Sequence, residues 1–359
     1  MIDLRSDTLT RPTEAMLESM REASFGDDSR DGDATVQKLE AMAAERTGKE
    51  AGAFMPSGTM TNLVAMLTHA QRGGEVLLEQ GSHTLNAELG GIAGVAGLFY
   101  RGIPGKRGAM DLERLGEAVR PTTRHQMGTA LIWMENTHNR AGGAVLPLAH
   151  MKAVHGLARE KGIPVHLDGA RIFNAAISLG VPPLEIAQYS DSVCFCVSKG
   201  LSAPVGSILC GSAAFIERAR ANRRMVGGNM RQAGPLAAAG IVALETMVNR
   251  LPEDHQSAKR LAEGFHRIDA SLCDPKDVET NLVRVDLKKS GKRAAQWSAD
   301  LKTKGVLVAP ADTWTLRFVT HRHISAPDVD AAVGAFADLW KKSLDTKDTK
   351  DTKEKQIRI

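Results

Sequence analysis

The pattern of apolar positions predicts a layered α/β protein. Up to Gly234, short apolar runs alternate with longer amphipathic segments. This alternation is typical of parallel strands joined by helical crossovers, with helices on both faces of the sheet. The clearest predicted strands are Glu75–Glu79, Leu131–Glu135, Val165–Asp168, Ser192–Val197 and Ser207–Cys210, and the clearest predicted helices are Met60–Ala70, Leu148–Lys161 and Ala213–Arg223.

The pattern changes after Gly234 and predicts a second domain. A long Ala-rich helix ends near Pro252, and a helix, several short strands and a closing helix follow, at 254–267, NLVRVDL, Val306–Val308, Leu316–Val319 and Ala326 to about Lys342. We therefore expect a large domain over 1–250, which includes the N-terminal segment, and a smaller α+β domain over 251–344. The final segment, 345–359, repeats Asp-Thr-Lys and has too little apolar surface to offset its ordering entropy, so it is expected to be a disordered tail.

Composition narrows the classes of protein that fit this pattern. Of the 359 residues, 43% are hydrophobic and 25% charged, which is ordinary for globular proteins. Aromatic residues make up only 4%, and the formal net charge of +4 is spread along the chain. Proteins that stack on nucleic-acid bases or bind the phosphate backbone through a basic patch differ on both counts. We expect no nucleic-acid partner.

Cysteine usage and hydropathy indicate the compartment. The four cysteines, Cys194, Cys196, Cys210 and Cys273, form no repeated Cys-x-x-Cys, and no histidine pair has metal spacing. This argues against a disulfide framework and against a zinc site, so we expect no metal. The N-terminus lacks a basic region before an apolar run, and no stretch approaches the roughly 20 apolar residues of a membrane span. We expect a cytoplasmic protein with no membrane partner.

Two charged residues stand where predicted strands end. In DSVCFCVSKGLSAPVGS an apolar strand runs into Lys199, and in HLDGARIFNAA the strand ends at Asp168. A partly buried lysine with a lowered pKa can form a Schiff base with an aldehyde. A carboxylate at the carboxyl end of a parallel strand points into the ligand crevice of an open sheet. The alternatives are a lysine that extends into solvent and an aspartate that only caps a helix.

The distance between these two residues favours the functional interpretation. Asp168 and Lys199 are separated by one strand–helix–strand crossover, which places both at the same edge of the sheet. In a pyridoxal phosphate enzyme, the carboxylate would pair with the protonated ring nitrogen.

Two further segments add candidate chemistry. In MPSGTMTNLVAML a strand end is followed by Ser57, Gly58 and Thr59 and then by a helix, a pattern that suits phosphate binding at a helix N-terminus. In GSHTLNAELGG, His83 and Glu88 follow another strand, and a histidine there can stack on a pyridine ring and move protons. Each segment alone fits a capped helix or a structural histidine, but the order phosphate loop, His, Asp, Lys is far more specific.

Five stretches in this chain resemble the motifs of one enzyme family, the low-specificity threonine aldolases. They are LRSDTLTRPT, FMPSGTMTN, HLDGARIFNA, SVCFCVSKGLSAPVGS and GGNMRQAG, and the resemblance covers residues 2–340. It implies the pyridoxal 5'-phosphate-dependent transferase-like fold of type I: a large domain with a mostly parallel seven-stranded sheet flanked by helices, and a smaller α+β C-terminal domain. It also implies retro-aldol cleavage of L-threonine, L-allo-threonine and related β-hydroxy-α-amino acids to glycine and an aldehyde.

The resemblance assigns roles to matching residues. Lys199 matches the Schiff-base lysine, Asp168 the partner of the ring nitrogen, and His83 the histidine stacked on the ring. The phosphate loop is matched by Ser57, Gly58 and Thr59. Ser6, Arg171 and Arg317 match positions that hold the substrate carboxylate, and Arg171 also matches a cofactor-binding position. His125 and Glu88 match positions near the substrate hydroxyl, and the sequence leaves open whether His83 or His125 is the base.

Family members are usually homotetramers, built as dimers of dimers that share their active sites. Arg224 and Arg231 match basic residues that the neighbouring subunit supplies to the cofactor phosphate. The resemblance therefore implies a second copy of this chain as a partner, in addition to an amino-acid substrate.

One loop departs from the family pattern. The family usually reads GDDVYGxDPT where this chain reads GDDSRDGDAT, so Arg30 replaces a tyrosine near the active site. Arg30 either shifts substrate preference towards polar or acidic β-hydroxy amino acids or pairs with Asp31 or Asp33 in a surface loop, and we favour the loop. Other type I reactions, such as β-elimination or transamination, use the same electron sink and stay open. A non-catalytic sensor on this fold is the most distant alternative.

Overall fold

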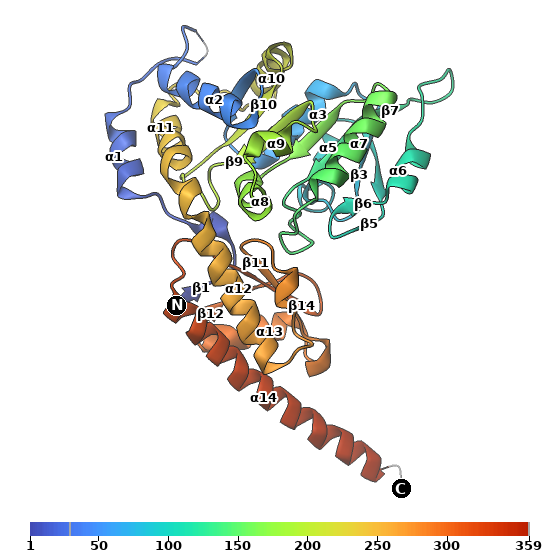
Figure 1. Cartoon of the computed structure of the whole chain (residues 1–359), viewed down its shortest axis with the longest axis vertical. Coiled ribbons are helices and arrows are strands. Elements are labelled where there is room, and N and C mark those ends of the chain that lie inside the picture. The colour runs from blue at the N-terminus through green and yellow to red at the C-terminus, as the bar shows by residue number, and fades with distance from the viewer. Residues whose placement is uncertain (29, 358–359) are drawn as a thin grey trace. The chain divides into compact units, whose positions relative to one another are not determined.

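The computed structural model describes residues 1–28 and 30–357, with side chains described up to Leu344 (Figure 1). The chain divides into a larger unit, Thr10–Leu251, and a C-terminal unit formed by Met1–Leu9 together with Pro252–Ile359. The sequence prediction differs in placing the first nine residues with the large domain. In the structure, β1 (Ile2–Asp3) pairs with β12 (Val306–Leu307) of the C-terminal unit. A pairing between segments so far apart leaves no local signal in the sequence.

The larger unit is built on a seven-stranded sheet in the order β2-β10-β9-β8-β7-β3-β4. Its strands are β2 (Ala51–Met55), β3 (Glu75–Glu79), β4 (Phe99–Ile103), β7 (Thr129–Glu135), β8 (Val165–Asp168), β9 (Ser192–Cys196) and β10 (Ser207–Gly211). Only β10 runs antiparallel to its neighbours, which confirms the predicted, mostly parallel sheet. Since β10 opposes both β2 and β9, those two strands point the same way. The carboxyl ends of β2, β9, β8, β7 and β3 therefore lie at one edge.

Helices cover both faces of this sheet, as the alternating pattern predicted. They are α1 (Glu14–Glu22), α2 (Ala34–Thr47), α3 (Gly58–His69), α4 (His83–Ala87), α5 (Gly91–Gly94), α6 (Leu112–Ala118), α7 (Leu148–Glu160), α8 (Ile172–Leu179), α9 (Pro183–Ala187), α10 (Ala213–Met225) and α11 (Gly234–Val242). A short hairpin, β5 (Gly105–Lys106) and β6 (Ala109–Met110), lies outside the main sheet.

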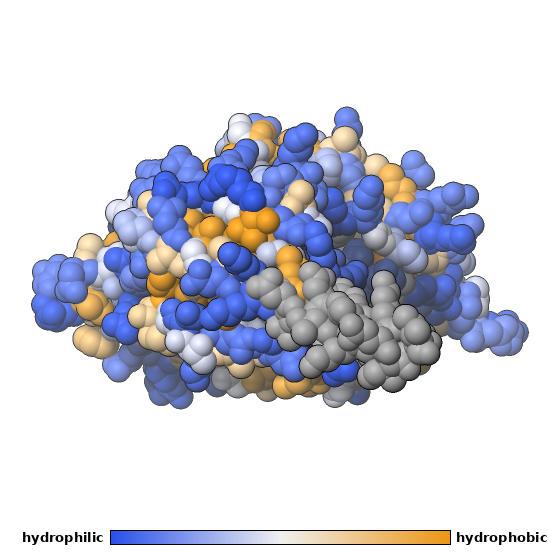
Figure 2. All heavy atoms as spheres, turned by 90° about the horizontal axis from the view of Figure 1, so that it is seen from below, coloured by the Kyte–Doolittle hydropathy of each residue, from blue (hydrophilic) through white to orange (hydrophobic). Residues whose placement is uncertain are grey.

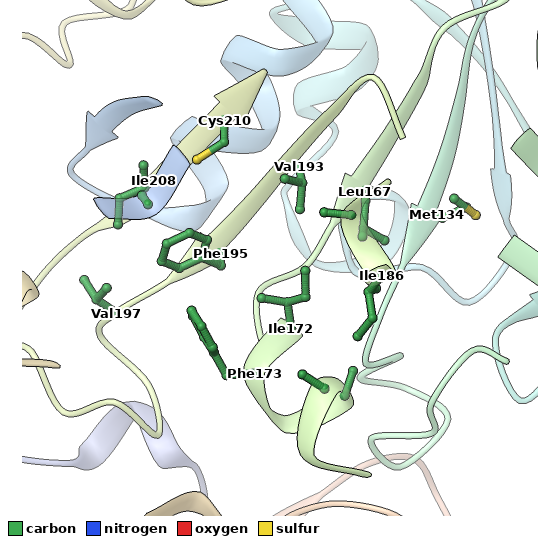
Figure 3. Close-up of a cluster of buried hydrophobic side chains, with 14 of the residues drawn as sticks. Met134, Leu167, Ile172, Phe173, Ile186, Val193, Phe195, Val197, Ile208 and Cys210 are labelled. Atoms are coloured by element: carbon green, nitrogen blue, oxygen red, sulfur yellow. The ribbon is translucent and has the colours of Figure 1, made fainter. Parts of the chain in front are cut away.

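Side chains alternate between the two faces of each strand, so each face has its own apolar core. On one face, Val193 and Phe195 pack with residues of α8 and α9 such as Ile172 and Ile186 (Figure 3). On the other face, Cys194 belongs to a separate buried cluster with residues of α3, α5 and α10. Strands β3, β8, β9 and β10 are buried on both sides, which explains their nearly continuous apolar sequences, whereas the edge strand β4 is mostly exposed.

The C-terminal unit has the α+β organisation expected from the sequence. The antiparallel sheet β11-β14-β13 is formed by Leu282–Asp286, Thr315–Val319 and Ala309–Pro310, and the helices are α12 (Leu251–Ile268), α13 (Ala294–Thr303) and α14 (Ala326–Ile357). Although aromatic residues are scarce in this chain, several of them gather in this core. Trp297 stacks on Phe336 with ring centroids 4.7 Å apart, and Phe336 also packs against Phe265.

Two helices differ from the prediction. The Ala-rich segment expected as one helix leaves α-helical geometry after Val242 and continues as a π turn (Ala243–Met247). There, Thr246 Oγ1 donates to the Val242 carbonyl at 2.7 Å, which competes with the regular backbone ladder. Helix α14 continues to Ile357, through most of the segment expected to be disordered. The Asp-Thr-Lys repeats contain no glycine or proline that would end a helix.

The described surface is mainly polar. The face shown in Figure 2 is predominantly hydrophilic, with smaller apolar patches between charged groups. No helix in the described part of the chain has both the length and the apolar character that a bilayer crossing requires.

Candidate active site

The carboxyl edge of the main sheet brings together polar groups from several strands. Glu135 ends β7 and is the register partner of Asp168, which ends β8; Asp168 in turn pairs with Cys194 of β9. Lys199 follows β9, and His83 begins α4 shortly after β3. Asp168 and Lys199 thus lie at the same sheet edge, as their spacing predicted.

Asp168 is buried and held by two N–H donors. Its Oδ2 accepts a hydrogen bond from Asn62 Nδ2 (2.9 Å), and its Oδ1 accepts from the backbone N–H of Ala170 (3.1 Å). The thiol of Cys194 approaches the same Oδ1 at 3.9 Å. A carboxylate offers about four acceptor positions, so Asp168 keeps capacity for one further donor.

His83 and Glu88 form a hydrogen-bonded pair beside this carboxylate. His83 Nδ1 lies 3.0 Å from Glu88 Oε1. The hydrogen bond to Glu88 raises the pKa of His83, although burial opposes the shift. Burial raises the pKa of Glu88, and the nearby Asp168 adds to the effect, while the hydrogen bond from His83 opposes it. Glu88 is therefore placed to stabilise a protonated His83 ring.

Lys199 is half-buried, and its backbone is fixed by two hydrogen bonds. Its carbonyl accepts from Thr10 Oγ1 (2.7 Å) and from the backbone N–H of Ser202 (2.9 Å). Ser202 has a φ of 66°, in the left-handed region, so this turn is a strained one for a residue with a side chain. Among the side chains that the structure describes, none forms a hydrogen bond or ion pair with Lys199 Nζ. The amine is available for a ligand.

The predicted phosphate loop lies at the start of α3. Ser57 caps this helix by accepting a hydrogen bond from the Met60 N–H (3.2 Å), and the side chains of Ser57 and Thr59 are exposed. A Cβ at Gly58 would come within 3.0 Å of Cys196 Sγ, so only glycine fits without a shift. The first N–H groups of a helix lack intrahelical partners and attract anions.

Three residues of the site region were missed by the sequence analysis: Asn62, Glu135 and Asn139. Glu135 is buried, and its oxygens accept from the backbone N–H groups of His83 (2.5 Å) and Asn139 (2.8 Å). Asn139 Oδ1 in turn accepts from Arg171 Nη1 at 3.4 Å. Glu135 thus links the histidine to the predicted carboxylate-binding arginine. Its place at the end of a predicted strand was a usable signal, whereas nothing in the local sequence marks Asn62.

Some predicted residues of the larger unit lie apart from this cluster. His125 is exposed in a loop, and its backbone N–H donates to Thr123 Oγ1 (3.3 Å); in the described structure, its side chain contacts no member of the cluster. Arg224 is also exposed. Arg231 Nη1 lies 3.2 Å from Asp27 Oδ2.

Arg30 is in a surface loop but does not pair with the residues that we expected. Its Nε lies 3.7 Å from Asp27 Oδ2, and its side chain is 76% exposed. Asp33, one of the expected partners, instead caps α2 and accepts from the N–H groups of Thr35 (3.0 Å) and Val36 (3.2 Å). A buried helix cap is a better use of that carboxylate than an exposed ion pair.

Ser6 and Arg317 belong to the C-terminal unit. Ser6 Oγ accepts from Thr8 Oγ1 (2.8 Å), and Arg317 Nη2 donates to the carbonyl of Arg5 (3.4 Å). Ser6 is thus part of the N-terminal segment Met1–Leu9, and Arg317 contacts that segment within the same unit.

Comparison with known proteins identifies the family. A model of the beta-eliminating lyases matches residues 3–288. The chain belongs to the beta-eliminating lyase family. This lyase is 43% identical over 344 residues to the probable low-specificity L-threonine aldolase 2 of Arabidopsis thaliana, covering 94% of this chain and 97% of the relative. It is 43% identical over 326 residues to the low specificity L-threonine aldolase of Escherichia coli K12, covering 90% of this chain and 95% of the relative.

A solved structure supports the fold. A threonine aldolase of Leishmania major superimposes with a TM-score of 0.81 at 18% identity, covering 95% of this chain and 100% of that one. The resemblance seen in the sequence motifs and the predicted fold class are thus both confirmed.

This lyase is a pyridoxal phosphate enzyme, as its family and relatives show, and the larger unit fits the cofactor. Lys199 offers an unpaired amine, Asp168 keeps a free acceptor position for a ring N–H, and Gly58 opens a helix N-terminus to a phosphate. When bound, the cofactor supplies an electron sink for negative charge that develops on the substrate Cα.

Proposed function

We propose that this lyase cleaves L-threonine, L-allo-threonine and related β-hydroxy-α-amino acids to glycine and an aldehyde. The observation that carries the proposal is the pairing of His83 with Glu88 beside Asp168, at the sheet edge where Lys199 also lies. Retro-aldol cleavage requires a base for the β-hydroxyl proton next to an electron sink. Here His83 is the base, and it lies beside a site suited to the cofactor that supplies the electron sink. The threonine aldolase names of its relatives support the same reaction.

The chain's own residues divide the work as follows. Lys199 holds the cofactor, Asp168 keeps its ring nitrogen protonated, and Ser57, Gly58 and Thr59 bind its phosphate. Arg171 binds the substrate carboxylate, a task suited to a guanidinium group. His83 removes the hydroxyl proton, and Glu88 stabilises the imidazolium that forms. The exposed position of His125 favours His83 as the base.

The same proposal includes a homotetramer in the cytoplasm, with active sites shared between subunits. Arg224 and Arg231 then reach the cofactor phosphate of a neighbouring copy. Two observations support a covering partner: Leu89, next to Glu88, is fully exposed, and Met225, next to Arg224, is 66% exposed. In the proposed assembly, a neighbouring copy would cover these two apolar side chains.

Product analysis tests the activity. The holoenzyme is incubated with the L and D forms of threonine and allo-threonine, and glycine and acetaldehyde are quantified. Equimolar glycine and acetaldehyde from the L forms is the expected result. Formation of 2-oxobutanoate and ammonia would instead identify β-elimination and overturn the proposal.

The role of Arg30 is tested in the same assay. Its exposed pairing with Asp27 supports a loop role, so Arg30→Tyr is expected to leave the ratio of threonine to β-hydroxyaspartate turnover unchanged. A tenfold change in that ratio would show that Arg30 selects the substrate.

A further inference from the structure

Asn62 is a buried amide between the two carboxylates of the candidate site. It lies in α3, and its Nδ2 is 2.8 Å from Glu88 Oε1 and 2.9 Å from Asp168 Oδ2. A primary amide carries two hydrogens, so each carboxylate receives one. A third acceptor, Thr84 Oγ1, lies further away at 3.3 Å. Asn62 is thus the direct link between the partner of His83 and the proposed partner of the cofactor ring.

The amide is held in this orientation from its other end. The thiol of Cys194 donates to Asn62 Oδ1 at 3.3 Å. Burial raises the pKa of this thiol well above its usual value, so the group stays protonated and acts as a donor. With Oδ1 occupied by Cys194, Nδ2 must face the two carboxylates.

The two carboxylates need such a donor because they are close and buried. Glu88 and Asp168 are 8% and 3% exposed, and one oxygen of each lies within 4.8 Å of the other and of a His83 ring nitrogen. Like charges at this distance repel strongly away from water, and one of them tends to bind a proton. Other titratable groups also face the cluster: Glu135, which lies against the His83 backbone, His138, which interacts with Asp168 and Glu135, and the protonated Cys194.

Protonation of Glu88 would end its charge pairing with His83. Two charge-assisted hydrogen bonds from one neutral amide favour the ionised form of both carboxylates without adding a positive charge. A lysine or arginine at this position would form an ion pair instead and reduce the negative charge that both His83 and a protonated ring nitrogen require.

We propose that Asn62 is a positioning residue that holds Glu88 and Asp168 side by side as separate carboxylates, so that one serves His83 and the other serves the cofactor ring. This inference rests on the proposed function for the role of His83, but its effect on cofactor binding does not depend on which substrate is cleaved.

Two variants of Asn62 and one control test the inference by equilibrium binding of pyridoxal 5'-phosphate. N62L keeps the size of the side chain and removes both donors, and N62D keeps the shape and adds a third carboxylate. T84V removes the distant contact of Asn62 and leaves both carboxylate bonds in place. The dissociation constant of the cofactor is measured by dialysis and visible absorbance across a pH series, together with the thermal unfolding of each apoenzyme.

The expected pattern has three parts. N62L weakens cofactor binding by about tenfold or more at every pH, the effect of losing a hydrogen bond to a charged group. N62D weakens cofactor binding at neutral pH. Its binding recovers towards that of the wild type as the pH falls, because the new carboxylic acid then donates one hydrogen bond. T84V stays within twofold of the wild type.

Two outcomes would overturn the inference. One is cofactor binding by N62L and N62D within twofold of the wild type at all pH values. The other is equal weakening in both variants with no recovery of N62D at acidic pH, which would indicate only a packing role. If N62L does not fold, the pH dependence of N62D decides. A wild type that binds the cofactor but does not cleave threonine would refute the proposed function and leave this test unaffected.

Discussion

Acidification should destabilise the larger unit through two buried histidines that lie away from the candidate site. Ser192 Oγ lies 2.6 Å from His69 Nε2 and 2.7 Å from His166 Nδ1. One hydroxyl has a single hydrogen to donate, so it donates to one ring and accepts from the other. The rings also pack against apolar groups, His166 on Trp133 at 4.2 Å and His69 on Phe215 at 4.4 Å.

Neither ring has a strong ionic partner. Burial lowers the pKa of His69 to about 4; Asp191 opposes this shift and Arg218 adds to it, both by less than burial does. Burial also lowers the pKa of His166 well below its usual value, and His69 adds to this shift. Both folded-state pKa values lie below the unfolded value of 6.5, so the unfolded chain binds more protons once the pH falls below 6.5.

The size of the effect follows from the shift of His69. A pKa of about 4 in the folded state and 6.5 in the unfolded state costs about 2 kcal/mol of unfolding free energy at pH 5 and about 3 kcal/mol at pH 4. The loss becomes negligible well above pH 6.5, where both states carry a neutral ring. His166 adds to the loss in the same direction.

Urea unfolding followed by circular dichroism at a series of pH values measures this loss. His69→Gln removes the titrating group, so the stability that the wild type loses between pH 7 and pH 5 should be smaller in the variant by about 2 kcal/mol. His255→Gln, in the C-terminal unit, should reduce the loss by a similar amount, because burial also lowers the pKa of His255 to about 4. Identical pH dependence of the wild type and His69→Gln would refute the reasoning.

Three further predictions concern single residues. Lys199→Ala should lose the visible absorbance of the bound cofactor and nearly all threonine cleavage, whereas Lys152→Ala, on the exposed face of α7, should keep both. Glu135→Gln leaves one of the two backbone N–H groups that bond to Glu135 without an acceptor. It should lower the free energy of unfolding by about 1–3 kcal/mol, measured by thermal unfolding, and should also lower kcat. Glu79→Gln is the control: Glu79 contacts Gly81 and not His83, so kcat should stay nearly unchanged. Gly206 has a φ of +118°, and a Cβ there would lie 2.3 Å from the Phe54 ring, so Gly206→Ala should lower the unfolding free energy by about 2 kcal/mol or more. Gly156→Ala, at an open helical position, should raise it by up to about 1 kcal/mol; equal effects of the two glycine substitutions in urea unfolding would contradict the steric argument.

The sequence by itself determined the layered architecture and the main candidate residues. Apolar strands that are buried on both faces, such as Ser192–Cys196, have a pattern that local burial dictates and that can be read without a structure. Asp168 and Lys199 were identifiable because Asp168 ends such a strand and Lys199 closely follows another. The crossover rule then placed them at the same edge.

Contacts between distant segments were decided only by the tertiary structure. Asn62 meets Glu88 across 26 residues and Asp168 across 106 residues, and Ile2 pairs with Val306. The partner of Arg30 was also wrong in the sequence prediction, because Asp33 is occupied by a helix cap. Local patterns record which face of an element is buried, but strand order determines which side chains meet at a sheet edge. For this reason the contacts that Asn62 and Glu135 make with the site became visible only in the folded chain.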